Sequence, residues 1–219
     1  MKSSLLNMVV VLTVITALVG AILGSVYKIT KEPISAATAK AQEEAIREVA
    51  PAFDNSPAEE SYEVSINGLT ATVFPAKKAG VLTGAAVKAS SMNGFGGEIS
   101  VMVGFELDGT IRNYRVLSHA ETPGLGAKMD DWFRTDKNRQ SVLGKNPSTS
   151  NLTVSKDGGD IDAITASTIS SRAFLESLRT AYAAFTDYNI DVASGSTSQT
   201  SVAADSTVVT VNQEEEAIQ

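Results

Sequence analysis

One apolar stretch near the start of the chain constrains the fold more than any other feature. From Leu5 to Tyr27 the sequence contains no charged residue. A helix of about 23 residues is roughly 35 Å long, which is enough to cross a bilayer's hydrocarbon core of about 30 Å. We therefore expect a transmembrane helix over residues 5–27, preceded by a short terminal segment, 1–4.

The same stretch has a second interpretation, as the apolar core of a cleaved signal peptide. Such cores are usually about 7–15 residues long and end at a small-x-small cleavage pattern. This stretch is longer and no convincing pattern of that kind closes it, so a retained anchor is favoured. Lysines lie on both sides of the span, and charge alone therefore leaves its orientation open.

The region after the span predicts an α+β domain built on antiparallel strands. Pro33 is typical of a first helical position, so a helix is expected from there to Val49, within a stalk that covers 28–55. Alternating apolar residues and the turn pairs Asn67-Gly68 and Asp108-Gly109 predict strands. Their expected ranges are 62–66, 69–73, 81–89, 99–107 and 110–117.

Two further helices and a tail complete the expected organisation. Apolar residues spaced three and four apart predict helices near 129–135 and from about Ser170 to Asp187. With these helices, a single domain is expected over 56–190. The last residues, 191–219, are rich in Ser, Thr and Gln and end in an acidic run, so we expect a disordered acidic tail.

Composition excludes several classes of function. The formal net charge of -7 argues against nucleic acid as a partner. The chain has no cysteine, which excludes disulfides, thiolate metal sites, iron–sulfur ligation and thiol redox chemistry. Any electron transfer by this chain therefore requires a bound cofactor.

The segment from Asp162 to Thr168 stands just before the long C-terminal helix and reads Asp-Ala-Ile-Thr-Ala-Ser-Thr. A helix start offers unpaired N–H groups and the positive end of the helix dipole, which together favour a phosphate. Thr168 would lie just ahead of the first turn. The alternative is that Thr165, Ser167 and Thr168 are only helix-capping hydroxyls.

A second segment, residues 119–128, reads His-Ala-Glu-Thr-Pro-Gly-Leu-Gly-Ala-Lys. Pro123 fixes one backbone angle, whereas Gly124 and Gly126 permit positive φ and close backbone approach, so the loop can fold against a flat or anionic ligand. An ordinary turn, with His119 as a hydrogen-bonding residue at its edge, is the alternative. A third segment, Asn93-Gly-Phe-Gly-Gly-Glu-Ile99, is a glycine-rich turn that matches neither a P-loop nor a Rossmann fingerprint.

In their order along the chain, these three segments resemble parts of the FMN-binding domain of two families. These are the G subunit of Rnf-type ion-translocating electron-transport complexes and the C subunit of sodium-translocating NADH:quinone reductases. Their motifs read roughly Asp-x-x-(Ser/Thr)-Gly-Ala-(Ser/Thr)-Thr and His-x-Glu-Thr-Pro-Gly-Leu-Gly. This chain has Ala166 and Ser167 where many members have Gly and Ala. The resemblance covers about residues 5–188, and the short region between span and domain favours the Rnf family.

The resemblance implies that FMN is bound covalently, by a phosphodiester on Thr168. Because threonine has no low-pKa nucleophile, we expect a separate flavin transferase to activate it. The other residues that the resemblance marks are a recognition frame for the transferase and a set of flavin contacts: Asp162, Thr165, Ala166 and Ser167 for the frame, and Glu121, Thr122, Gly124, Leu125 and Gly126 for the contacts. No catalytic residue and no metal ligand is expected.

The implied function is a membrane-anchored electron carrier of an ion-translocating oxidoreductase, without a complete active site of its own. Its expected partners are the other membrane and redox subunits of the complex. The resemblance further implies a single-pass protein of the bacterial inner membrane, with a cytoplasmic N-terminus and the domain on the periplasmic side. Alternatives are a quinone-reductase C subunit, a stand-alone anchored flavoprotein that feeds an extracellular reductase, and a non-redox binding module on a membrane stalk.

Overall fold

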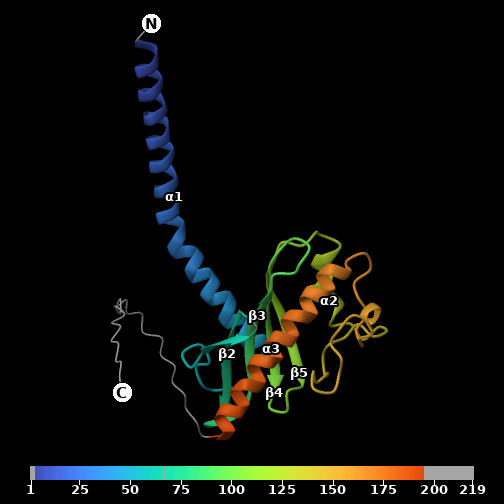
Figure 1. Cartoon of the computed structure of the whole chain (residues 1–219). Coiled ribbons are helices and arrows are strands. Elements are labelled where there is room, and N and C mark those ends of the chain that lie inside the picture. The colour runs from blue at the N-terminus through green and yellow to red at the C-terminus, as the bar shows by residue number, and fades with distance from the viewer. Residues whose placement is uncertain (1–2, 67, 195–219) are drawn as a thin grey trace, which may run out of the picture.

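The chain forms a long helix, a five-stranded sheet and a second long helix, as Figure 1 shows. The computed structural model describes residues 3–66 and 68–194. Its elements are α1 Ser3–Val49, β1 Tyr62–Ile66, β2 Leu69–Lys78, β3 Val81–Ser91, β4 Ile99–Glu106, β5 Ile111–His119, η1 Gly126–Lys128, α2 Met129–Trp132, η2 Ser155–Asp157 and α3 Thr168–Ser194. Asn67, expected in a turn with Gly68, lies outside the described residues. The expected disordered tail, 191–219, is helical at 191–194, where α3 continues, and lies outside the described residues from 195 onward.

The sheet has the order β1-β2-β3-β4-β5, and every neighbouring pair is antiparallel. Each strand therefore pairs with the next one along the chain, as short turns between strands allow. Val87 of β3 stands opposite Val73 of β2 and Val103 of β4, which aligns branched apolar side chains across the sheet. The expected α+β class with antiparallel strands is confirmed.

Both faces of the sheet are covered, because successive strand residues point to opposite sides. Val73 joins the larger core, between the sheet and α3, whereas the adjacent Phe74 joins a smaller core under the end of α1. Likewise Val103 and Met102 of β4 belong to the two different cores. Helix α3 therefore covers one face of the sheet and the last turns of α1 cover the other.

Helix α1 is continuous through Pro33, so the expectation that a new helix begins at this proline is wrong. A proline within a helix removes one N–H from the hydrogen-bond ladder and kinks the axis. The residues on both sides of Pro33 remain helical. Figure 1 shows that the helix bends part-way along its length. The apolar stripe expected from Ile34 is buried only in its last part, since Ile34 is 61% exposed whereas Ala45 and Val49 are buried.

The N-terminal part of α1 is long and apolar enough to cross a membrane, by length and composition. Its large apolar side chains are exposed, with values between 47% for Val19 and 65% for Met8 and Leu12. At the other end, the Glu48 carboxylate forms ion pairs with Arg115 at 3.0 Å and Arg134 at 3.5 Å. The helix is thus fastened to the sheet at one end and presents an apolar surface at the other.

Helix α3 begins at Thr168, two residues before the expected start, and continues to Ser194. Phe174, Leu178 and Phe185 are fully or almost fully buried, as their helical spacing predicts. The first residue of this helix is therefore the threonine that the sequence singled out. The helix expected near 129–135 is the shorter α2, which follows the turn η1 directly.

Candidate functional site

Three segments that are far apart in the sequence meet at the start of α3 and enclose a pocket of about 350 Å³. One segment is the glycine-rich turn between β3 and β4, the second is the loop after β5, and the third is the first turn of α3. The residues that line this pocket are Phe95, Glu121, Thr122, Leu125, Gly126, Ala166, Ser167, Thr168, Ile169 and Ser170. The two principal motifs, which are distant along the chain, thus form one site.

Glu121 holds the three segments together. Its side chain is buried, with 5% exposed. One carboxylate oxygen accepts a hydrogen bond from the Gly96 N–H at 3.0 Å, and the other accepts one from the Ser170 hydroxyl at 2.5 Å. Hydrogen bonds to a charged acceptor are stronger than neutral ones, so this buried carboxylate sets the relative positions of the pocket walls.

Glycines around Glu121 allow the segments to approach this closely. A Cβ atom at Gly94 would lie 2.6 Å from one Glu121 carboxylate oxygen, and a Cβ at Gly126 would lie 2.6 Å from the other. At Gly96, a Cβ would overlap the carbonyl group of Ala120. These glycines are therefore required by packing, whereas Gly124 has a φ of +77° and no atom within 4 Å of a Cβ built on it.

The loop after β5 is a tight turn followed by η1. The Leu125 N–H donates to the Thr122 carbonyl at 3.1 Å, with Pro123 and Gly124 between them, as in a type II turn. The turn leaves Leu125 pointing outward with 40% of its side chain exposed. The expected turn chemistry of Pro123 and Gly124 is thus present. Gly124, expected as a flavin contact, does not line the pocket, and the close approach occurs at Gly126.

Thr168 is half-buried at the first position of α3. The first N–H groups of a helix have no partner within the helix and carry the positive end of its dipole. The Lys156 ammonium donates a hydrogen bond to the Thr168 Oγ1 at 3.4 Å. A hydroxyl in this position lies in a field that favours a negative group.

The residues before α3 form a sharp turn. Ala166 has a φ of +63°, in the left-handed region that favours glycine. The Ser167 N–H donates to the Ile164 carbonyl at 3.0 Å, and the Ser171 hydroxyl donates to the Ser167 carbonyl at 2.9 Å. This turn places Ala166, Ser167 and Thr168 in the lining of the pocket, and a glycine at position 166 would suit its backbone.

Two members of the expected recognition frame lie apart from the pocket. Asp162 does not line it: the Arg139 guanidinium donates to its carboxylate at 3.3 Å, and its carbonyl accepts from the Trp132 indole at 2.9 Å. Hydrogen bonds from Ser155 and then from Arg139 hold the pKa of Asp162 below its usual range. Thr165 is exposed and also outside the lining.

An apolar rim surrounds the mouth of the pocket. Phe95 is 70% exposed, Ile169 is 49% exposed and Leu125 is 40% exposed. Each comes from a different segment, and all three line the same pocket. Apolar side chains that converge on a concave site with a few polar groups are typical of a site for a flat, largely apolar ligand. The isoalloxazine ring of FMN meets that description, so the residues present fit this cofactor.

Four residues of the site were missed by sequence reasoning: Phe95, Lys156, Ile169 and Ser170. Ile169 follows Thr168 directly, but it was not expected in the pocket lining. Phe95 belongs to the glycine-rich turn that the sequence did identify, but its role as a pocket wall was not expected. Ser170 was taken only as the start of a helix, and Lys156 lies in a loop that shows no pattern. Within the described residues, no group of three or more His, Asp or Glu side chains could hold a metal ion.

The fold and the pocket define an FMN-binding domain, and the FMN-binding domain family matches residues 94–183, from the glycine-rich turn into α3. Several curated relatives are named as the G subunit of an ion-translocating oxidoreductase complex. The relative from Vibrio atlanticus is 44% identical over 115 residues, which are 49% of this chain and 52% of that protein. The relative from Erwinia tasmaniensis is 32% identical over 180 residues, which are 78% of this chain and 84% of that protein.

The extent of these matches differs between relatives. The match to the Vibrio atlanticus protein spans about half of its length, and the match to the Salmonella typhi protein, 35% identical over 136 residues, spans 65%. The Erwinia match, in contrast, spans most of both chains. This chain therefore belongs to the family of G subunits of ion-translocating oxidoreductase complexes, and the resemblance based on the two motifs is confirmed.

Proposed function

We propose that this chain is the membrane-anchored electron carrier of an Rnf-type ion-translocating complex, with FMN attached to Thr168 by a phosphodiester. Thr168 carries this proposal, because its hydroxyl lies at the start of α3 and on the wall of the apolar pocket. The family membership and the FMN-binding domain support it. When bound, FMN supplies redox chemistry that no side chain of this cysteine-free chain provides.

The chain's own residues bind and orient the cofactor. Phe95, Leu125 and Ile169 offer apolar surface to the isoalloxazine ring, and their exposed fractions leave one side of the site open to a redox partner. Glu121 keeps the walls in position through Gly96 and Ser170. Ala166 and Ser167 shape the turn that presents the Thr168 hydroxyl. We assign Thr122 and Gly126 as further contacts, since both line the pocket.

The long N-terminal helix is proposed to anchor this site to the bilayer. Residues 5–27 form the membrane-spanning part, and residues 28–49 of the same helix form the stalk. The last turns of α1 pack directly on the sheet, which joins the end of the stalk to the FMN-binding domain, here 56–190. We propose further that the N-terminus is cytoplasmic and that the domain lies on the periplasmic side.

Maturation and function require partners. A threonine hydroxyl is a weak nucleophile, so a flavin transferase is proposed to attach FMN to the chain. We propose that such an enzyme recognises the segment of Asp162, Thr165, Ala166 and Ser167. Within it, Thr165 and Ala166 are exposed and Asp162 is partly exposed. The relatives' names support other subunits of an oxidoreductase complex as electron donor and acceptor.

Mass spectrometry of the full chain, purified from its native membrane, tests the attachment. Intact mass and peptide mapping should find FMN as a phosphodiester on the peptide that contains Thr168. Thr168→Val should abolish covalent flavin and leave the domain folded, because the side chain is only half-buried and similar in size. Thr149→Val is the matched control: this threonine is exposed and lies outside both the pocket and the segment 162–168, so flavin should remain.

Two results would contradict the proposal. Covalent flavin that persists in Thr168→Val would move the attachment to another hydroxyl, such as Ser167 or Thr165. A flavin-free peptide in the wild-type protein, with the transferase active in the same cells, would favour a binding module without a redox role. Co-purification of the flavin-loaded chain with multi-span subunits separates a complex subunit from a stand-alone flavoprotein.

A further inference from the structure

Lys156 brings a positive charge to the attachment threonine from a different part of the chain. It lies in η2, and its ammonium donates a hydrogen bond to the Thr168 Oγ1 at 3.4 Å. The side chain is otherwise exposed. In the part of the chain that the structure describes, Lys156 forms no ion pair within 4 Å, so its charge is not neutralised by direct contact with a carboxylate.

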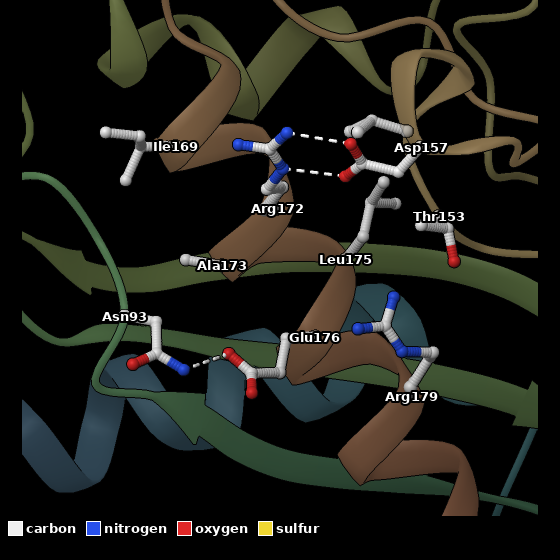
Figure 2. A pocket seen from close by; sticks show the side chains of 10 residues that line it. Asn93, Thr153, Asp157, Ile169, Arg172, Ala173, Leu175, Glu176 and Arg179 are labelled. Carbon is white, nitrogen blue, oxygen red and sulfur yellow. Dashed lines mark hydrogen bonds and ion pairs between the residues drawn. The ribbon is translucent and has the colours of Figure 1, made fainter.

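An adjacent ion pair fastens the Lys156 loop to α3. The Arg172 guanidinium donates two hydrogen bonds to the Asp157 carboxylate, each at 2.7 Å, as Figure 2 shows. Arg172 is four residues after Thr168, one turn further along the same side of α3. Because Asp157 follows Lys156 directly, this bidentate pair fixes the backbone of η2 next to Thr168 and occupies the nearest carboxylate.

Further contacts hold the rest of the loop. Val154 forms a parallel bridge with Ile161, and both side chains are buried in the main core. The Arg179 guanidinium, two turns beyond Arg172, donates to the Leu152 carbonyl at 2.5 Å. The backbone of the loop that carries Lys156 is therefore attached to α3 on one side and to the core on the other, which keeps the Lys156 ammonium within reach of Thr168.

We propose that Lys156 is the counter-charge of the phosphodiester on Thr168. A phosphodiester carries one negative charge at neutral pH, and lysine is a common partner for phosphate as a compact point charge. This inference rests on the proposed attachment of FMN to Thr168. The ammonium binds the phosphate from η2, which is not among the pocket walls. Asp157 and Arg172 act as positioning residues for it.

The unfolding temperature of the full chain in detergent tests this role without any measurement of electron transfer. Protein is prepared from cells with and without an active flavin transferase, so that loaded and flavin-free forms can be compared for each variant. In the wild type, flavin attachment should raise the unfolding temperature, because the negative phosphodiester on Thr168 then forms an ion pair with the Lys156 ammonium. Lys156→Gln should reduce this rise, and Lys156→Arg should retain most of it.

The time course of flavin attachment, followed by peptide mass, gives a second readout. Lys156→Gln should slow attachment about two- to fivefold, the size expected for a solvent-exposed charge pair. The difference between Lys156→Gln and the wild type should shrink in high salt. Lys137→Gln is the matched control, because this lysine is exposed and lies outside the pocket and the Lys156 loop. It should behave like the wild type.

The outcomes separate this inference from the proposal on which it rests. A Lys156→Gln protein with wild-type attachment kinetics and a wild-type rise in unfolding temperature would overturn the counter-charge role alone. A wild-type Thr168 peptide without flavin would overturn both. Attachment that is about two- to fivefold slower in Lys156→Gln, with an unchanged unfolding temperature of the flavin-free form and normal loading of Lys156→Arg, would support the role.

Discussion

Replacement of Glu121 by alanine should destabilise the protein because this carboxylate joins three segments. The substitution removes the acceptor of the buried Ser170 hydroxyl, which is 2% exposed, and the acceptor of the Gly96 N–H. A hydrogen bond to a charged group contributes about 1.5–3 kcal/mol. Gly96 is exposed, so water can replace its bond in part. We therefore expect the free energy of unfolding to fall by about 3 kcal/mol.

Glu121→Gln distinguishes the loss of the contacts from the loss of the charge. A glutamine oxygen can accept from Gly96, and its amide can donate to the Ser170 hydroxyl, which also acts as an acceptor. This variant should lose only about 1 kcal/mol. Glu98→Ala is the control, because this glutamate is exposed and follows the same turn; its effect should stay within about 0.5 kcal/mol.

Urea unfolding of the full chain in detergent measures these differences. Trp132 is the only tryptophan, and it lies near the site, with its indole N–H bonded to the Asp162 carbonyl. Its fluorescence therefore follows the unfolding of this region. Equal free energies of unfolding for Glu121→Ala and Glu121→Gln, or a loss below about 1 kcal/mol for the alanine variant, would refute the view that the carboxylate holds the walls together.

Two further substitutions test how α1 packs on the sheet and how the Asp157–Arg172 ion pair contributes to stability. Gly104→Ala should cost about 1–3 kcal/mol, because its Cβ would overlap the Val49 carbonyl and push α1 from the sheet; the urea midpoint should fall, whereas Gly20→Ala, with open space around it, should leave it unchanged. Hydrogen bonds from Arg172 hold the pKa of Asp157 below its ordinary value. The ion pair therefore makes its full contribution to the stability of the folded protein above the pKa of an aspartate in the unfolded chain, about 3.9. The difference in midpoint between wild type and Arg172→Gln should be constant from about pH 8 to pH 5 and shrink below about pH 4, and a difference that grows in acid would contradict it.

The strands were predictable because their signals are local. Alternating apolar residues mark each strand, and Asp108-Gly109 supplies a turn in which Gly109 has a φ of +86° and the Thr110 N–H donates to the Asp108 carboxylate. The strand bounds differ from expectation mainly where β2 continues to Lys78 and β5 to His119. These extensions are decided by pairing with neighbouring strands, which local patterns do not contain.

The helix boundaries show where local rules lose to their surroundings. Pro33 is typical of a helix start, yet α1 continues through it. One missing backbone hydrogen bond costs less free energy than ending a helix whose residues form regular turns on both sides of the proline. The apolar stripe after it was expected to face a partner, but only its last residues, such as Ala45 and Val49, meet the sheet. Where a helix docks depends on the small residues of the sheet, here Gly104, and not on the helix alone.

The sequence by itself determined the antiparallel α+β class, the apolar helix, and the two motifs that identify the family, because these depend on residues close together in the chain. Only the tertiary structure decided which motif residues share a pocket. It joined Glu121 to Ser170, left Asp162 and Thr165 outside, and brought Lys156 to Thr168. Such contacts arise when sheet pairing and helix packing bring distant loops together, and no local pattern in the sequence encodes the distance between them.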